Sequence, residues 1–259
     1  MKRIFTLFLS IAFFCSFTTV SAQGIDWIKE HYIKKDYRIE MRDGIKLFTS
    51  VYSPKDTTKN YPILMVRTPY TVAPYGEDKY PDNLGPNESF PKDGYIFVFQ
   101  DVRGMFLSEG QFDDMRAYIS NKKSNKDTDE SSDTYDTIDW LVKNLKHNNS
   151  NVGIWGISYP GFYAAMSLID SHPALKAVSH QAPISDWFIG DDMHHHGALT
   201  LSMTYNFFKG FGQVRDSLTT HWKNGPEYPS PDMYNFFLNM GPISNANKKY
   251  LKGKVPFWN

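Results

Sequence analysis

The segment Val152–Leu168, VGIWGISYPGFYAAMSL, places one serine between two glycines. An apolar run comes before the pattern Gly156-x-Ser158-x-x-Gly161, and a helix-like run follows it. In a parallel sheet, a serine in a sharp strand-to-helix turn has an exposed hydroxyl, and the helix N-terminus favours a developing oxyanion. The pattern therefore predicts a nucleophile elbow at Ser158. The alternative is a tight turn that contains serine by chance, since the motif is one residue longer than the general G-x-S-x-G.

The segments around this serine alternate between strands and helices. An Asp43-Gly44 turn between Tyr37–Met41 and Ile45–Tyr52 predicts a hairpin. Short apolar runs predict buried strands at Tyr61–Arg67, Tyr95–Asp101, Val152–Trp155 and Leu175–Ser179.

Two helices are predicted between these strands. Apolar residues recur at helical spacing from Ile138 to Leu145, after a polar surface loop at 117–133 in which Ser132 or Asp133 is the N-cap. A second helix follows Ser158 and ends near Asp170. Strands that alternate with helices predict an α/β fold, with a mostly parallel sheet and helices on both faces.

The first 22 residues are predicted to be a secretory signal peptide. A basic start precedes an apolar run, Ile4–Val20, and the small residues VSA at 20–22 suit cleavage before Gln23. A membrane anchor is the alternative, but the run is slightly short for a span. Because the only cysteine, Cys15, lies in this segment, the mature chain has no disulfide. We expect a periplasmic or secreted protein that has no membrane attachment after cleavage.

The composition limits the partners of the chain. The 259 residues are 41% hydrophobic, which is enough for one sizeable core. Lysine and arginine balance aspartate and glutamate to a net charge of zero, so no charge excess favours nucleic acid or anionic lipid. Composition alone therefore argues against these two classes of partner.

Four motifs follow one another along the chain: VRTPY at 66–70, QDVRGMFLSEGQF at 100–112, GISYPG at 156–161 and GDDMHHHGA at 190–198. Together they resemble the serine hydrolases that include cocaine esterase, X-prolyl dipeptidyl-peptidase and, nearest, the α-amino-acid ester hydrolases. The resemblance implies an α/β-hydrolase core, a helical cap and a C-terminal jelly roll. On this basis we expect an incomplete core at 23–185 and part of the cap at 186–259.

The resemblance also implies roles for three residues. Ser158 matches the nucleophile, and the backbone N–H of Tyr159 would donate to the oxyanion. Tyr70, at the end of the VRTPY strand, matches the tyrosine whose hydroxyl is the second donor. A phenol suits this task because it stays protonated at pH 7. Without the resemblance, Tyr70 would be interpreted as a surface tyrosine after a proline.

The GDDMHHHGA segment bears on the substrate. In the amino-acid ester hydrolases an acid in the corresponding segment holds the α-ammonium group; Asp192 matches it, and Asp191 lies beside it. The alternative is a solvated acidic turn. The run His194–His196 suggests a metal, but adjacent side chains on a helix point about 100° apart and rarely converge on one ion. We interpret these histidines as cap packing and polar lining, and expect neither a metal nor another cofactor.

Asp101 and Arg103 lie at another strand end, where a structural ion pair that holds the following loop is favoured over catalysis. A triad in this fold follows the order Ser, Asp, His. No acid or histidine after Ser158 follows a later buried strand, so we expect the catalytic Asp and His beyond Asn259. The chain is accordingly interpreted as the N-terminal part of a longer enzyme, inactive alone.

Two classes of function remain open at this point. The first is a secreted serine hydrolase or acyltransferase that forms an acyl-enzyme on Ser158 and acts on esters or amides with a free α-amino group. Preferences like those of cocaine esterase or of an X-Pro dipeptidyl-peptidase are alternatives within this class. The second class is a non-catalytic secreted remnant. For the first class, the resemblance implies a small-molecule ester, amide or short peptide as the partner, and a homo-oligomer of the full-length form is possible.

Overall fold

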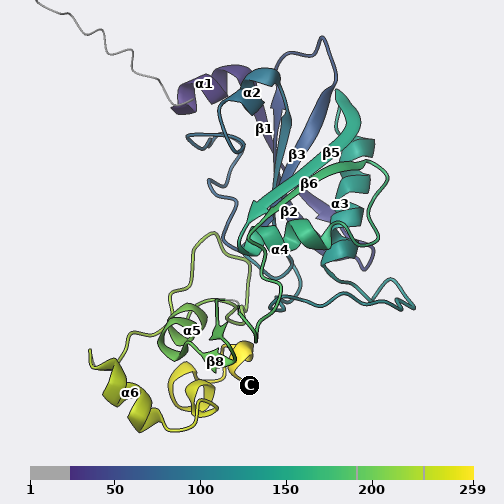
Figure 1. Cartoon of the computed structure of the whole chain (residues 1–259). Helices are drawn as coiled ribbons and strands as arrows, with labels where there is room; N and C mark the ends of the chain where they lie inside the picture. Colours follow the sequence, from purple (N-terminus) through teal and green to yellow (C-terminus); the bar gives the residue numbers. More distant parts are fainter. Residues whose placement is uncertain (1–23, 191, 230) are drawn as a thin grey trace, which may run out of the picture.

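The computed structural model describes residues 24–190, 192–229 and 231–259. The predicted signal peptide at 1–22 and Asp191 lie outside these residues. Figure 1 shows a sheet flanked by helices, with a smaller group of elements from the C-terminal part of the chain at one end of it. Over the part of the chain that is described, every helix is too short or too polar to cross a membrane.

The central sheet, counted over the described residues, has six strands in the order β1-β2-β4-β3-β5-β6. Their bounds are β1 Tyr32–Glu40, β2 Lys46–Pro54, β3 Tyr61–Thr68, β4 Ile96–Asp101, β5 Asn148–Ile157 and β6 Leu175–Gln181. β3 runs parallel to β4 and β5, and β5 runs parallel to β6. β2 pairs antiparallel with both β1 and β4. The predicted α/β architecture with a mostly parallel sheet is confirmed.

The predicted hairpin is the pair β1–β2. Its register places Tyr37 opposite Thr49 and Glu40 opposite Lys46. Gly44 takes φ 87° in the turn, a conformation that favours glycine over residues with a Cβ. β1 starts five residues before the predicted Tyr37, because the pairing with β2 continues back to Tyr32 opposite Pro54.

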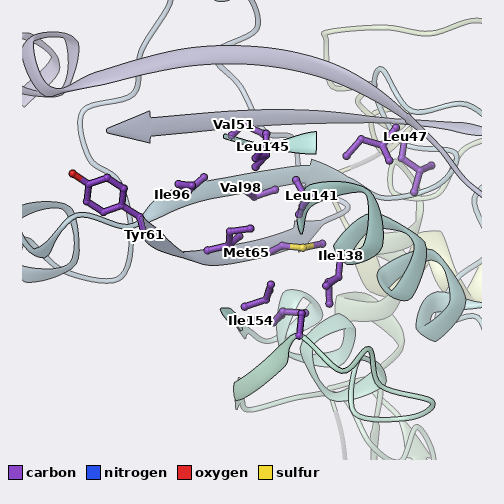
Figure 2. Packing of buried hydrophobic residues seen from close by; sticks show 14 of the residues in the cluster. Leu47, Val51, Tyr61, Met65, Ile96, Val98, Ile138, Leu141, Leu145 and Ile154 are labelled. Carbon is purple, nitrogen blue, oxygen red and sulfur yellow. The ribbon is translucent and has the colours of Figure 1, made fainter. Parts of the chain in front are cut away.

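Helices cover both faces of the sheet, as predicted. They are α1 Gly24–His31, α2 Ser89–Asp93, α3 Glu130–Asn144 and α4 Tyr159–Met166. Successive side chains of a strand point to opposite faces. Met65 of β3 accordingly belongs to one cluster with Ile138 of α3, whereas Leu64 packs in a second cluster with Ile28 of α1. Figure 2 shows the first of these clusters, where Met65 and Ile138 lie between the sheet and α3.

Two sequence predictions about this region were wrong. The strand expected to be buried at Leu175–Ser179 is β6, which lies at the edge of the sheet and is mostly exposed. The loop predicted at 117–133 ends earlier, because α3 begins at Glu130 with Asp129 as its N-cap. The Asp129 carboxylate accepts from the Ser132 N–H, and Ser132 is the third helical residue rather than the cap. Residues 129–133 are buried.

Residues 186–259 form a separate group of short elements. They are the hairpin β7 His194–His195 and β8 Ala198–Leu199, the helices α5 Leu201–Phe208 and α6 Met233–Met240, the π-helical turn η1 Ala246–Leu251 and the 3-10 turn η2 Pro256–Trp258. An aromatic cluster joins them to the start of α4, through contacts such as that between the rings of Phe211 and Tyr159. The predicted helical character of this segment is therefore partly interrupted by a hairpin and by loops. The domain boundary after residue 185 stays a prediction.

Candidate active site

Ser158 lies in the turn between β5 and α4. Its backbone takes φ 61° and ψ −122°, which L-residues rarely adopt. A Cβ on Gly156 would meet the Pro160 carbonyl oxygen at 2.2 Å, and one on Gly161 would meet the Gln181 carbonyl oxygen at 2.5 Å. Both positions therefore require glycine. The Ser158 N–H donates to the Gln181 carbonyl at 2.9 Å, which ties the turn to the end of β6.

Tyr159 follows as the first residue of α4. Because the first four N–H groups of a helix have no partner inside it, its backbone N–H is free to donate to a ligand oxygen. Its side chain is buried, and the hydroxyl donates to the Asp114 Oδ1 at 2.7 Å. The Met115 N–H donates to the same hydroxyl at 2.9 Å. The side chain therefore fixes the start of α4 against the loop that carries Asp114 and Met115.

Tyr70 comes two residues after the end of β3, and its N–H donates to the Thr68 hydroxyl at 3.0 Å. Its ring packs edge-to-face on Tyr159, with the centroids 6.1 Å apart. Burial, with the negative charges of Asp114 and Asp192, raises the pKa of Tyr70 to about 12. The hydroxyl thus stays protonated and able to donate, and Tyr70 lies beside the residue that follows Ser158.

Asp192 lies just before the β7–β8 hairpin, and its backbone carbonyl accepts from the Thr200 hydroxyl at 3.0 Å. The side chain is exposed, yet its charge acts on Tyr70, so Asp192 lies near the site. Asp191, the other acid of the predicted substrate contact, lies outside the described residues. Tyr70 and Tyr159 therefore pack together, and the charge of Asp192 acts on Tyr70.

The three histidines belong to the β7–β8 hairpin rather than to a helix. His194 Nδ1 lies 2.6 Å from the Trp187 carbonyl oxygen, and the rings of His195 and His196 are 4.6 Å apart. Among the residues that the structure describes, no three His, Cys, Asp or Glu side chains are grouped as metal ligands.

The acid and the arginine of the QDVRG motif are both structural, but they have different partners. Asp101 is buried and accepts from the Val72 N–H at 3.0 Å and the Tyr75 hydroxyl at 2.9 Å. Burial raises the pKa of Asp101 to about 7. Arg103 contacts Asp43 and Asp133, each at 2.6 Å between nitrogen and oxygen. The predicted ion pair between Asp101 and Arg103 is therefore wrong: Arg103 pairs with Asp43 and Asp133, while Asp101 accepts hydrogen bonds from Val72 and Tyr75.

Sequence reasoning missed two residues near the site. Asp114 holds the Tyr159 hydroxyl, and burial raises the pKa of this carboxyl to about 6. Arg67 is buried at the end of β3, where its Nη1 lies 3.1 Å from Glu130 Oε2. The sequence offers one signal for each residue. Asp114 is an acid shortly after the motif QDVRGMFLSEGQF, and Arg67 is a charged residue inside the apolar run YPILMVR.

Comparison with known proteins places this site in context. The profile described as X-Pro dipeptidyl-peptidase (S15 family) matches residues 43–232. Cocaine esterase of Rhodococcus sp. (strain MB1 Bresler) is 29% identical over 174 residues, which are 65% of this chain and 27% of the esterase.

Two solved structures extend the similarity over more of the chain. An α-amino acid ester hydrolase superposes with a TM-score of 0.74 at 32% identity, covering 97% of this chain and 40% of that one. An aminopeptidase from a marine sediment Thaumarchaeota archaeon gives a TM-score of 0.72 at 33% identity, covering 88% of this chain and 37% of that one. The chain therefore spans well under half the length of each of these relatives.

Proposed function

Because the chain belongs to the X-Pro dipeptidyl-peptidase (S15) family and has the α/β-hydrolase fold, we propose that it carries the nucleophile and the oxyanion donors of a serine hydrolase. The proposed substrates are esters or amides of acyl groups with a free α-amino group. One observation carries the proposal: Ser158 lies in a strained strand–helix turn, with Tyr70 packed against Tyr159 beside it.

The chemistry follows from this arrangement. The Ser158 Oγ attacks the carbonyl carbon of the substrate, and its proton passes through a base to the leaving group as the bond to that group breaks. The oxyanion accepts from the Tyr159 N–H and the Tyr70 hydroxyl. Since burial raises the pKa of Tyr70 to about 12, the phenol remains a donor throughout. Water, or an amine acceptor, then takes the acyl group from Ser158.

The base and its supporting acid are proposed to be a histidine and an aspartate that follow Asn259 in the full-length enzyme. The triad of this fold follows the chain order Ser, Asp, His. Among the described histidines after Ser158, His180 on β6 and His221 after α5 have exposed side chains. A chain without that pair would not turn over substrate, since losing a triad member costs on the order of 10⁴ to 10⁶ in kcat.

Asp192 is the proposed partner of the substrate ammonium group. It lies close enough to Tyr70 for its charge to act on that hydroxyl, so a substrate whose carbonyl oxygen meets Tyr70 brings its α-carbon toward the same acid. A carboxylate facing a bound ammonium makes a charge-assisted hydrogen bond, which is stronger than a neutral one. Asp191 is proposed to support this contact.

A second candidate is a hydrolase that takes neutral acyl groups, favoured by the 29% identity to cocaine esterase. An X-Pro dipeptidyl-peptidase-like specificity is a third, favoured by the family match over residues 43–232. If Ser158 forms no acyl-enzyme even in the full-length protein, the chain would be a non-catalytic remnant.

The test compares two esters in the full-length protein: an α-amino ester, and the matched ester with hydrogen in place of the amino group. Asp192→Asn should raise the activation free energy that corresponds to kcat/KM by about 2–5 kcal/mol for the amino ester. It should leave kcat/KM for the des-amino ester nearly unchanged. Ser158→Ala should remove the acyl-enzyme seen by mass spectrometry with both esters. An equal loss for both esters in Asp192→Asn would favour the neutral-acyl candidate instead.

The cell location is part of the same proposal. A cleaved signal peptide would place the enzyme in the periplasm or outside the cell, with a small ester, amide or short peptide as its partner. Mass spectrometry of exported protein should then give an N-terminus at Gln23. Recovery of chains that begin at Met1 from the cytoplasm would contradict export.

A further inference from the structure

A cavity lies between the loop at 112–114 and the C-terminal elements. It has a volume of about 250 Å³. Its lining includes the two acids Asp113 and Asp114 and the four phenylalanines Phe112, Phe208, Phe211 and Phe257. We propose that this cavity binds a small organic cation, such as an alkylammonium group, with Asp114 as its counter-charge. None of Ser158, Tyr70 or Asp192 lines the cavity, so the site is separate from the proposed acyl site.

The first support is the chemistry of Asp114. Its Oδ1 accepts from the Tyr159 hydroxyl, which holds the carboxyl in place without neutralising it. Within the part of the chain that the structure describes, no lysine or arginine lines the cavity. A partly buried carboxylate without a basic neighbour is costly, and a bound cation would remove that cost. The neighbouring Asp113 differs, because its side chain is 68% exposed and lies 3.9 Å from Arg116.

The second support is the aromatic wall. Phe208 and Phe211 are fully buried, and Phe112 packs edge-to-face on Phe211 at 5.3 Å between centroids. Phe257 is 36% exposed and stacks on Phe208, so it gives the cavity an aromatic rim. Aromatic rings attract organic cations and also bury their alkyl groups, whereas a strongly hydrated metal ion prefers a shell of oxygen ligands to an aromatic wall.

The cavity is one side chain away from the nucleophile. Tyr159 has its backbone N–H at the oxyanion position, while its hydroxyl reaches Asp114 at the cavity wall. Phe211 likewise contacts Tyr159 on one side and lines the cavity on the other. A cation bound at Asp114 would therefore contact the side chain of the residue whose backbone N–H is the proposed oxyanion donor.

The test titrates the full chain with n-butylammonium and with 1-pentanol, a neutral ligand of similar size, at pH 8. Proton–nitrogen NMR spectra follow the amide signals of Met115 and Gly212, which border Asp114 and the cavity. We expect saturable shifts with butylammonium, and at least about tenfold weaker binding of pentanol. Asp114→Asn should weaken butylammonium binding by about tenfold and leave pentanol binding unchanged.

Asp113→Asn is the matched control, since it removes the same charge from the exposed rim. It should change butylammonium binding by less than about threefold, because exposed charges are screened. Equal binding of the amine and the alcohol, or binding of the amine that Asp114→Asn leaves intact, would overturn the proposal. The amine–alcohol comparison uses the unaltered chain, so it decides the question even if Asp114→Asn does not fold. Neither outcome depends on turnover at Ser158.

Discussion

The sheet and the C-terminal elements are stabilised in different ways. The sheet region, up to about residue 185, pairs its strands in register and buries charged groups such as Arg67, Arg103 and Asp133 in contact with one another. The C-terminal elements are short and pack mainly through aromatic rings, as Tyr205 and Phe236 do. They also leave large apolar side chains exposed, among them Tyr234 at 76%.

This difference separates two properties of the site. The position of Ser158 depends on backbone geometry, which glycines and strand register determine. The position of Asp192 depends on how aromatic side chains pack around a hairpin. Substitutions in the sheet region should therefore affect stability and every substrate, whereas those at exposed positions of the C-terminal elements should be milder or depend on the substrate.

The largest stability loss in the sheet region is expected from Arg103→Ala. It leaves the carboxylates of Asp43 and Asp133 without the arginine between them, and Asp133 is fully buried. Breaking a buried ion pair in this way costs about 3–5 kcal/mol. Arg42→Ala is the control, because Arg42 makes a similar contact with Asp136 but is 29% exposed; it should cost less than about 1 kcal/mol. Urea denaturation of both variants measures the difference, and equal losses would contradict a sheet region stabilised by buried charge.

The second effect is a pH dependence from Asp101. Burial raises the pKa of this carboxyl from 3.8 to about 7, so the folded state holds the proton more tightly than the unfolded state. The protonated Asp101 carboxyl therefore makes its full contribution to the free energy of unfolding below pH 3.8, and this contribution is lost as the pH rises through about 7. Asp101→Asn should remove a penalty of up to about 4 kcal/mol at pH 8. Subtracting the variant's pH profile from that of the wild type isolates this group, and a flat difference would rule it out.

The third effect tests the glycine next to the nucleophile. Gly156→Ala would push a Cβ to 2.2 Å from the Pro160 carbonyl oxygen, a backbone atom that cannot rotate away. We expect a loss of about 3 kcal/mol or a displaced turn. Gly153→Ala lies on the same strand, where the nearest atom is Leu64 Cδ1 at 3.4 Å, and should be nearly neutral. Thermal melting compares the two, and similar losses would mean that the turn is not the sensitive point.

The smallest effect is expected on the exposed face of α6. Tyr234→Ser on α6 changes a side chain that is 76% exposed, so stability should move by no more than about 0.5 kcal/mol. Phe236 lies two residues further along the same helix and is buried against Tyr205 and Tyr228. Phe236→Ala should therefore cost about 3–5 kcal/mol. A large loss for Tyr234→Ser would show that the exposed face of α6 is covered in solution.

The predictability of the site from sequence follows the same division. The turn at Ser158 could be predicted because it is local: the apolar run, the two glycines and the helix lie within a few residues. The start of α3 could not, since residues 129–133 are polar and become buried only because arginines from β3 and the loop after β4 reach them. Partners so far apart in the chain leave no spacing to recognise.

β6 and the hairpin show two further limits. The apolar residues of Leu175–Ser179 correctly predict a strand. Only the order of the strands shows that this strand lies at the edge of the sheet. Helical geometry was the wrong assumption for His194 and His195, which form the strand β7. Nothing in the segment GDDMHHHGA indicates a two-residue strand. The aromatic packing that brings Asp192 near Tyr70 is likewise not encoded in any local pattern.

The hydrogen bond from the Ser158 N–H to the Gln181 carbonyl makes the nucleophile depend on the least buried strand of the sheet. Amide hydrogen exchange at Ser158 therefore reports on the opening of β6 rather than on the unfolding of the core. If β6 frays on its own, this amide should exchange faster than that of Val102, which donates to the Thr68 carbonyl on the central strand β3. Anything that pairs with the open edge of β6 would slow that exchange and thereby tighten the turn that holds the serine.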